Sequence, residues 1–277
     1  MVEGIVMNSG AKISMFEKFV LKTGEGPIGE RVESQGRWLS DARIFNPLLF
    51  PYVHATIPNG YIMERLTPIH LARIDKTLLF VDVIQKLEEL WTTGQGWHVH
   101  NKDTPDYDER CEGRWEEHMS YIMSRAASYC PWVVPHLVGM QDNLDPTKFH
   151  YCKAHGDPTL ENVMLHPRDG RIVLIDPLPP SNRIPECKES DVGKLMQSAS
   201  GYEDIKISRT AHVQFARKHL HTIFSTVGWV GLDYEHERMA AQYFERCCWV
   251  RLIPYQQEMV RHLYEERLRA IIDFRNI

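Results

Sequence analysis

Short strands and one helix are predicted by the first part of the chain. Apolar and β-branched residues gather in residues 2–7 and 13–22 around turn residues, a pattern typical of a small antiparallel sheet. Residues 29–42 change to helical spacing. The apolar face of this helix is formed by Val32, Trp38, Leu39 and Ala42. A further strand over residues 61–63 leads to a polar break that closes at Pro68.

Helices dominate the rest of the chain. Apolar residues recur near helical spacing over residues 69–91 and again over 115–127. Residues 94–113, between them, are rich in Gly, Asp, His and aromatic residues without periodicity, so we expect an insertion or lid there. Four more helices are predicted after Asp191, separated by glycines and a proline. Their ranges are 191–200, 205–226, 233–250 and 255–273.

Composition excludes several classes of function. The 277 residues, 43% hydrophobic and 25% charged, can bury one large core or two modest lobes. A formal net charge of −5 disfavours a nucleic-acid binder, which usually carries a basic face. No run approaches the roughly eighteen apolar residues of a membrane span, and the start MVEGIVMNSGAK lacks the features of an export signal. Six cysteines without a C-x-x-C pair favour reduced thiols in a cytoplasmic protein.

The candidate chemistry is concentrated in HGDPTLENVM, which begins at His155, and in IVLIDP, which ends at Pro177. Asp157 and Asn162 lie five positions apart across a polar loop, and Asp176 directly follows an apolar strand. Phosphoryl transfer requires alignment of the attacking hydroxyl and neutralisation of phosphate charge, with little covalent chemistry from the protein. Asp157 can orient the hydroxyl and take its proton, while Asn162 and Asp176 offer oxygen ligands to Mg²⁺.

Other interpretations of these residues are possible. Asp, Asn and Pro are ordinary turn residues, and His155 with Asp157 could merely cap a turn. A metal-dependent hydrolase using His155, Asp157 and Asp176 would need further ligands at short helical spacing, such as H-E-x-x-H, and the sequence lacks them. The ordered spacing of the whole set favours phosphoryl transfer.

Three further histidines could in principle bind a metal ion. His98 and His100 alternate in the predicted insertion, and His118 follows in the next helix. Their spacing matches no recognised metal site, so exposed histidines without a metal are the favoured interpretation.

The HGDPTLEN segment resembles the kinase-like phosphotransferases that include aminoglycoside and choline kinases, in particular the members that read HGD-x-T-x-E-N. The segment DVGKLMQSASGYE from Asp191 is similar to the Asp-x-x-Lys-Leu helix start that follows the metal aspartate in that group. The resemblance implies an α+β, bilobal protein-kinase-like fold with a small antiparallel β lobe, residues 1–66, and a larger, mostly helical lobe, residues 67–277. The second lobe would hold the catalytic loop 155–162 and Asp176, and His155 would be structural, orienting that loop.

The same resemblance assigns nucleotide-binding residues. Lys22, which ends a predicted strand, would contact the nucleotide phosphates, although a solvated lysine is the alternative. Glu30 and Glu33 share one face of the next helix, and either, with Glu33 preferred, could pair with Lys22. The hinge that binds the adenine edge would consist of Met63, Glu64 and Leu66.

The sequence departs from the family pattern at the loop that covers the phosphates. A G-x-G-x-x-G segment is absent, and only Gly10 with Lys12 stands at its expected place. A single glycine lets fewer backbone amides approach a triphosphate. Lys12 could itself reach a phosphate.

These observations together predict an ATP- or GTP-dependent phosphotransferase that uses Mg²⁺ and acts on a hydroxyl of a small metabolite, such as a sugar, amino alcohol or nucleoside. The link from Asp176 to Asp191, PLPPSNRIPECKES, holds four prolines and is too short for the activation segment of a protein kinase, which disfavours a protein substrate. The alternative is a catalytically silent, kinase-like nucleotide-binding or interaction protein, suggested by the missing glycine-rich loop.

Overall fold

The computed structural model describes most of the chain, and the described residues form two compact units. The first unit comprises Met1–Ile74 and Glu161–Pro179, and the second comprises Asp75–Leu160 and Pro180–Ile277. The described residues are 4–6, 10–69, 71, 74–94, 106–178, 184–208, 213–228, 234–256 and 258–275.

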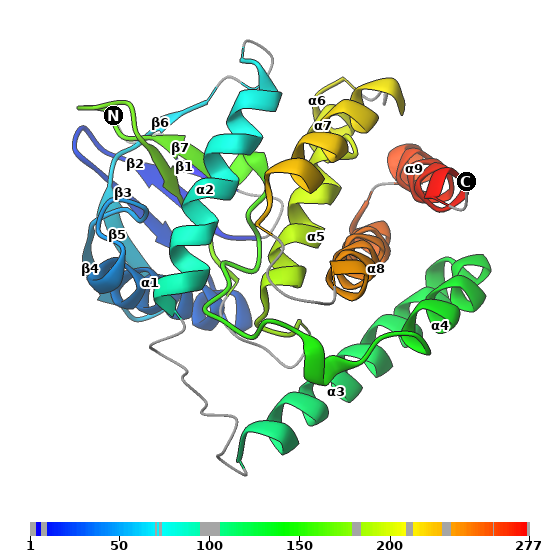
Figure 1. Cartoon of the computed structure of the whole chain (residues 1–277). Coiled ribbons are helices and arrows are strands. Elements are labelled where there is room, and N and C mark those ends of the chain that lie inside the picture. Colours follow the sequence, from blue (N-terminus) through cyan, green and yellow to red (C-terminus); the bar gives the residue numbers. More distant parts are fainter. Residues whose placement is uncertain are drawn as a thin grey trace. The chain divides into compact units, whose positions relative to one another are not determined.

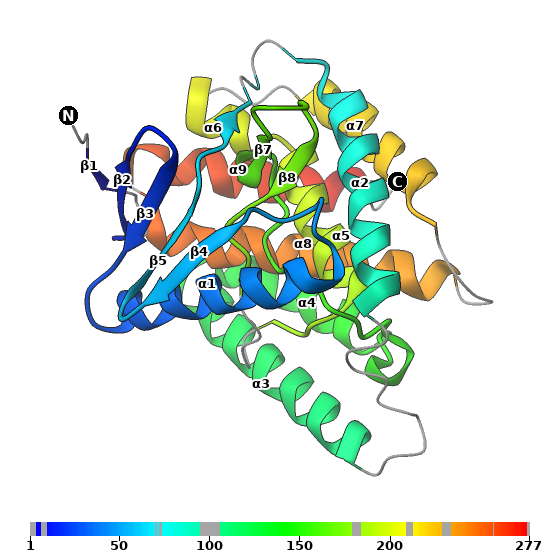
Figure 2. The same cartoon turned by 90° about the vertical axis from the view of Figure 1, so that its left-hand side faces the viewer.

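A five-stranded antiparallel sheet forms the main part of the first unit, in the order β1-β2-β3-β5-β4. The strands are β1 (Gly4–Val6), β2 (Lys12–Met15), β3 (Phe19–Thr23), β4 (Val53–Ile57) and β5 (Gly60–Glu64). Helix α1 (Pro27–Phe45) lies across the sheet beside β4 and β5, as Figure 2 shows. Pro27 is tolerated in the first helical turn, where its missing N–H would have no partner. The predicted strands and helix are therefore present, and β4 is an additional strand.

A second, three-stranded sheet also belongs to the first unit. It consists of β6 (Thr67–Pro68), β7 (Val163–Leu165) and β8 (Ile172–Leu174). The N–H of Leu174 donates to the carbonyl of Leu49 at 2.9 Å, which ties the hairpin to the rest of this unit. The compact units thus divide the chain differently from the lobe boundary predicted between residues 66 and 67, because β6 pairs with β7.

The second unit is helical. Its helices are α2 (Lys76–Gly94), α3 (Asp106–Tyr129), α4 (Val134–Gln141), α5 (Lys188–Ala199), α6 (Tyr202–Ser208), α7 (Val213–Thr226), α8 (Tyr234–Leu252) and α9 (Glu258–Arg275). Every residue of α5 is buried, and α5 and α8 lie side by side (Figure 1). A Cβ atom added to Gly193 of α5 would lie 2.6 Å from the Cβ of Phe244 on α8, so this contact requires glycine.

Two helical predictions need correction. Residues 106–113 belong to α3, so the predicted insertion at 94–113 is partly helical, and residues 95–105, including His98 and His100, lie outside the described residues. The helix predicted over 205–226 corresponds to α6 and α7, with residues 209–212 between them not described.

His118, one of the three candidate metal histidines, is buried in α3 rather than exposed. Its ring stacks on Trp115 with centroids 5.7 Å apart and lies 5.5 Å from the ring of Phe244. These aromatic side chains belong to the core of the second unit. The burial of His118 is therefore explained by aromatic packing.

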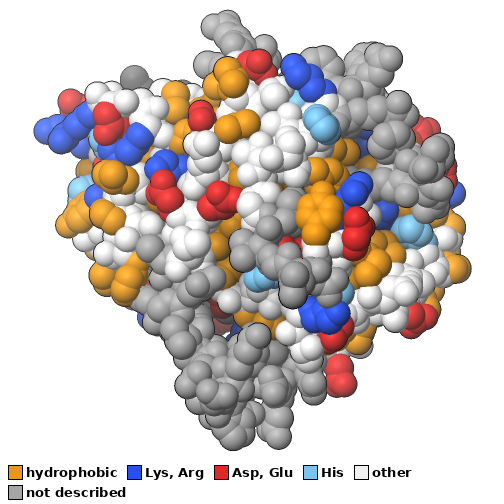
Figure 3. Space-filling model, in the orientation of Figure 1, with side chains coloured by type: hydrophobic (Ala, Val, Ile, Leu, Met, Phe, Trp, Pro, Cys, Tyr) orange, Lys and Arg blue, Asp and Glu red, His pale blue; other side chains and the backbone are white. Residues whose placement is uncertain are grey.

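The described surface and helices bear on possible partners. None of the helices within the described ranges is long and apolar enough to cross a membrane. On the face drawn in Figure 3, acidic and basic side chains of the described residues lie among one another.

Candidate active site

The start of the HGDPTLEN loop is held by Asp191 in the first turn of α5. The carboxylate of Asp191 accepts the backbone N–H of His155 at 2.8 Å and that of Gly156 at 2.7 Å. The indole N–H of Trp91 on α2 donates to the same carboxylate at 3.0 Å. Burial raises the pKa of Asp191 to about 6, although these three hydrogen bonds favour the charged form. The loop backbone is thereby fixed to α5, whose residues are all buried.

Local geometry explains the His-Gly-Asp order. Gly156 has φ 79°, in the left-handed region that glycine adopts without strain. The backbone N–H of Asp157 donates to Nδ1 of His155 at 3.3 Å, a contact that suits the predicted structural role of His155. The carboxylate of Asp157 forms an ion pair with Lys194 of α5 at 3.1 Å.

The far end of the loop is also anchored within the second unit. The N–H of Leu160 donates to Oγ of Ser198 at 3.0 Å and to Oε1 of Glu203 at 3.1 Å. The hydroxyl of Ser198 in turn hydrogen-bonds Glu203. Both ends of the segment that carries Asp157 are thus bonded to buried helical residues, so Asp157 lies on a rigid support.

Lys22, Asn162 and Asp176 belong to the first unit. Lys22 on β3 places its Nζ atom 2.7 Å from Oδ1 of Asp176, and its side chain is only 6% exposed. The hydroxyl of Tyr61 donates to the same oxygen at 3.2 Å. Burial and the nearby Asp176 charge raise the pKa of Tyr61 well above its usual range, so Tyr61 stays a neutral donor. Asp176 has φ 56°, a conformation that non-glycine residues adopt mostly where function or packing requires it.

The β7–β8 hairpin brings Asn162 and Asp176 to the same end of one ladder. Val163 pairs with Leu174, and the N–H of Ile175 donates to the carbonyl of Asn162 at 3.0 Å. Asn162 therefore faces the residue before Asp176. A carboxylate and an amide oxygen are donors that Mg²⁺ accepts, so the two side chains fit a magnesium site.

The predicted pairing of Lys22 with Glu33 or Glu30 is wrong. Lys22 instead donates to Oε1 of Gln35 at 3.1 Å. Glu33 pairs with Arg37 and accepts the N–H of Asn59, and Glu30 is exposed. The reason is the side of α1 on which each of these residues lies.

Gln35 belongs to the buried face of α1, and the two glutamates do not. It bridges Lys22 and the strand end beyond Asp176. Its Oε1 accepts from Lys22, and its Nε2 donates to the carbonyl of Pro177 at 2.9 Å. An amide side chain can accept at one end and donate at the other, which an ionised carboxylate cannot do.

We expect Gln35→Glu to destabilise the protein. A glutamate would set an oxygen against the carbonyl of Pro177 and place a second carboxylate beside Asp176, at a cost of about 1–3 kcal/mol. Urea denaturation measures the free energy of unfolding. Gln85→Glu, at an exposed position of α2, is the matched control. Equal stability of both variants would contradict a bridging role for Gln35.

The two residues predicted to replace the glycine-rich cover lie at a small pocket. Gly10 and Lys12 line a cavity of about 280 Å³ together with Ile28. Lys12 is exposed and its ammonium pairs with Glu25 at 2.9 Å. A phosphate contact by Lys12 would have to replace this weak surface pair.

Of the predicted hinge residues, Met63 and Glu64 end β5, and Leu66 follows it. Met63 and Leu66 are buried. Glu64 exchanges hydrogen bonds with Tyr52, donating its N–H to the carbonyl at 2.8 Å and accepting the Tyr52 N–H with Oε1 at 2.8 Å. Its other carboxylate oxygen lies 3.5 Å from Nε2 of His166. The Glu64 side chain thus makes these contacts within the first unit, and adenine binding at this segment stays a prediction.

A pocket of about 1270 Å³ in the first unit is lined by Glu64 and Leu66. Basic residues also line it: Lys18, Arg43, Arg65, Arg168 and Arg171. Lys22, Asn162 and Asp176 are not among the described residues that line it. We therefore assign the candidate chemistry to the Lys22 and Asp176 pair and not to this pocket.

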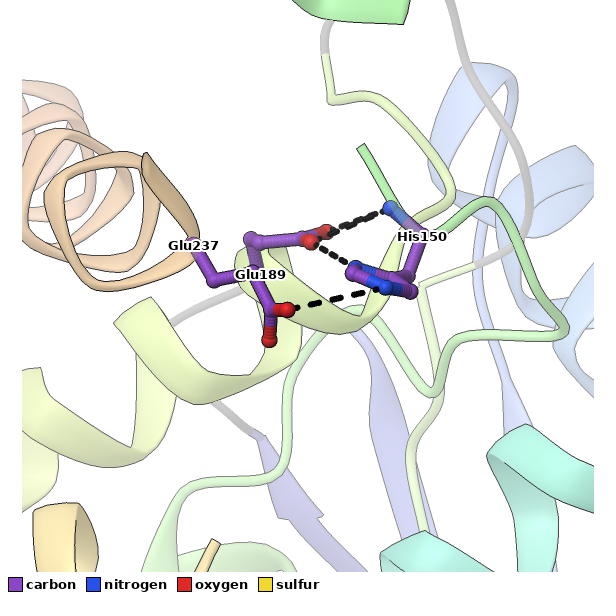
Figure 4. Close-up of side chains that lie close together, drawn as sticks. All are labelled: His150, Glu189 and Glu237. Carbon is purple, nitrogen blue, oxygen red and sulfur yellow. Dashed lines mark hydrogen bonds and ion pairs between the residues drawn. The ribbon is translucent and has the colours of Figure 1, made fainter. Parts of the chain in front are cut away.

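A His–Glu–Glu cluster lies just before the catalytic loop in the second unit (Figure 4). Nδ1 of His150 lies 2.6 Å from Oε1 of Glu189, and Nε2 lies 3.7 Å from Oε1 of Glu237. Among the residues that the structure describes, these three have ligand atoms within 4.8 Å of one another, close enough to share a metal ion. Lys188 Nζ, however, lies 3.9 Å from the other oxygen of Glu237. A protonated imidazole between two carboxylates explains this geometry without a metal.

The charge of His150 should make stability depend on pH. The hydrogen bond to Glu189 raises the pKa of His150, against the opposing effect of burial. A raised pKa means that the folded protein binds this proton more tightly than the unfolded chain does. The resulting stabilisation is complete below the pKa of the unfolded chain, about 6.5, and is lost once the pH exceeds the pKa of the folded protein. We expect His150→Gln to lose about 1 kcal/mol of unfolding free energy at pH 6, after allowance for solvent screening, and less at pH 9. Exposed His221→Gln is the control, and a pH-independent loss would refute a charged His150.

Several functional residues were not identified from the sequence. Trp91, Tyr61 and Gln35 act through contacts 100 or more positions away, with Asp191, Asp176 and Pro177 respectively. Of these three residues, only Gln35 has a signal in the sequence. It is a polar residue within the apolar face of its helix.

Comparisons with known proteins bear on the fold. No protein-family model matches the sequence, and no curated protein does. The ethanolamine kinase of Plasmodium vivax superposes with a TM-score of 0.58 at 13% identity, over 98% of this chain and 82% of that chain. A choline/ethanolamine kinase family protein from Mesorhizobium loti gives 0.60 at 12% identity, over 98% and 88%. The streptomycin-ATP-APH(2″)-IIa ternary complex gives 0.54 at 15% identity, over 97% and 91%.

Structural similarity at such low sequence identity shows the fold alone. The small antiparallel sheet and the larger helical part match those of the choline and ethanolamine kinases, as the sequence predicted. The chain has the bilobal protein-kinase-like fold found in small-molecule phosphotransferases.

Proposed function

We propose that this protein is a phosphotransferase that moves the terminal phosphoryl group of ATP or GTP to a hydroxyl of a small metabolite. The observation that carries the proposal is the ion pair between the buried Lys22 and the half-buried Asp176, which follows a hairpin whose same end bears Asn162. A structural ion pair alone would not require an amide ligand beside it or an aspartate with φ 56°. Phosphoryl transfer requires a cation and oxygen ligands in this combination.

Each residue has a defined part in the proposed reaction. Asp157 orients the acceptor hydroxyl and takes its proton. Asn162 and Asp176 would hold Mg²⁺, which supplies neutralisation of phosphate charge when bound. Lys22 binds phosphate oxygens, and Gln35 keeps its ammonium in place. Both contacts to Asp176 go to Oδ1, so among the described neighbours Oδ2 is available to a metal ion.

The fold comparisons support a choice of the first acceptors to test. The similar structures are an ethanolamine kinase, a choline/ethanolamine kinase family protein and a complex that contains streptomycin. Amino alcohols and amino sugars are therefore the first acceptors to test, before neutral sugars and nucleosides. The free thiols of the described cysteines agree with a cytoplasmic enzyme, where nucleoside triphosphates are available.

The proposal is tested by incubating the protein with Mg²⁺ and γ-labelled ATP or GTP across a panel of these alcohols. Transfer of label to an acceptor is expected, and Lys22→Met should abolish it while exposed Lys218→Met should not. A protein that binds nucleotide but transfers no label to any acceptor or to water would refute the proposal.

A nucleotide-binding protein without turnover is the second candidate. It is favoured by the neutral Gln35 at the lysine and by the engagement of Lys12 with Glu25. Thermal unfolding with and without Mg²⁺ and ATP distinguishes the two. Stabilisation without turnover supports this candidate.

A further inference from the structure

The ion pair between Asp157 and Lys194 is not required by any of the roles assigned above. Lys194 Nζ lies 3.1 Å from Oδ1 of Asp157, and the two side chains are 10% and 24% exposed. Lys194 belongs to α5, and Asp157 to the loop that α5 anchors. A nearly buried cation is therefore fixed on the residue proposed as the base.

The helix positions Lys194 by simple spacing. Asp191 and Lys194 are three residues apart and so lie on the same side of α5. Asp191 binds the loop backbone at His155 and Gly156, and Lys194 binds the loop side chain at Asp157. One face of one helix thus holds both the main chain of the loop and its carboxylate.

Lys194 is held as a cation. Burial would lower the pKa of Lys194, but the Asp157 carboxylate and Cys248 together oppose burial, and the pKa is raised. Cys248 and Arg251 of α8 are the other titratable groups that influence it, and the ring of Tyr202 lies 5.8 Å from Nζ. A buried ammonium without a counter-ion is costly, so this pair persists at neutral pH.

We propose that Lys194 is a positioning residue for phosphoryl transfer, a role that rests on the proposed function. Lys194 contacts Oδ1 and thereby restricts the rotation of the Asp157 carboxylate that accepts the proton of the acceptor hydroxyl. The O–H bond of the acceptor breaks, its proton moves to the Asp157 carboxylate, and the oxygen bonds to phosphorus as the nucleoside diphosphate leaves. The ammonium also neutralises the negative charge of Asp157 and so reduces its repulsion of the nucleotide phosphates.

The first test needs neither nucleotide nor acceptor. NMR of ¹³Cε-labelled lysine follows the titration of Lys194, assigned by the loss of its signal in Lys194→Arg. In Asp157→Asn the pKa of Lys194 should fall, because burial then acts without the opposing Asp157 carboxylate. Lys86 of α2, which pairs with Glu89, serves as internal control and should titrate unchanged. An unaltered Lys194 titration would overturn the proposal.

The second test separates positioning from folding. With ATP and Mg²⁺ as the probe, Lys194→Met should lower kcat by roughly tenfold to a hundredfold with KM for ATP nearly unchanged. Lys194→Arg keeps the charge and should recover part of the rate. Lys194→Gln replaces the methionine variant if that variant does not fold.

The outcomes separate this role from the proposed function. Undiminished kcat in the uncharged variants overturns the role of Lys194 alone. Loss of rate that arginine does not recover overturns it too, since a merely structural lysine would behave that way. A wild type without turnover refutes the proposed function and this role with it, whereas the NMR titration still decides whether the ion pair exists.

Discussion

Replacement of Asp157 by asparagine should lower kcat for phosphoryl transfer by roughly a thousandfold, within the usual contribution of a general base. The substitution keeps the shape of the side chain but removes the group that takes the hydroxyl proton. The backbone bonds of His155 and Gly156 to Asp191 do not involve the Asp157 side chain, so the loop should keep its conformation. KM for nucleotide should change little, because Asp157 is not proposed to bind phosphate.

The measurement is steady-state turnover of Mg²⁺ and ATP with the best acceptor, accompanied by thermal unfolding of both proteins. Asp142→Asn, at an exposed position after α4, is the matched control and should retain wild-type turnover. Full activity in Asp157→Asn would place the base at another residue. A large loss of thermal stability would instead point to the unpaired Lys194 as the cause.

Short-range structure determines how Asn162 and Asp176 lie in the hairpin. Asn162 and Asp176 are separated by one hairpin, and an apolar strand followed by an acid predicts where that hairpin ends. The strands and helices follow local periodicity, whereas the kinase-like fold was implied by the resemblance of the HGDPTLEN segment to kinase-like phosphotransferases. Roles for Asp157, Asn162 and Asp176 remain predictions until they are tested by substitution.

The partner of Lys22 could not be predicted, because it depends on the rotation of α1 about its own axis. Glu30, Glu33 and Gln35 lie within two turns of this helix, and only the burial pattern separates them. Gln35 faces the sheet with Val32 and Leu39, whereas Glu33 faces Arg37. A polar residue inside an apolar stripe is the signal that selects Gln35.

Strand β4 was missed although the sequence carried a signal for it. Residues 53–57 read VHATI and alternate between half-buried and exposed side chains. The pattern is short and follows two prolines, which mark turns, and no element was predicted for it. Pairing with β5 supplies the hydrogen bonds that a short edge segment needs.

Asp191→Asn should be the most destabilising of the conservative substitutions considered. The carboxylate accepts three hydrogen bonds while fully buried, from Trp91, His155 and Gly156. Asparagine retains one acceptor oxygen and turns an N–H group toward a donor, and each buried donor left unsatisfied costs about 1–3 kcal/mol. A total near 3 kcal/mol corresponds to a fall in Tm of roughly 6–12 °C for a protein of this size.

Turnover should fall together with stability, because the backbone that carries Asp157 loses its fixed orientation. Trp91→Phe removes one donor but leaves both loop bonds to Asp191, so it should cost only about 1 kcal/mol and retain most of the activity. Asp82→Asn, on the exposed side of α2, controls for loss of charge alone. If Trp91→Phe reduces turnover as much as Asp191→Asn does, the backbone bonds are not what supports the loop. An Asp191→Asn protein with wild-type Tm would show that the loop is held by Ser198 and Glu203 at its other end.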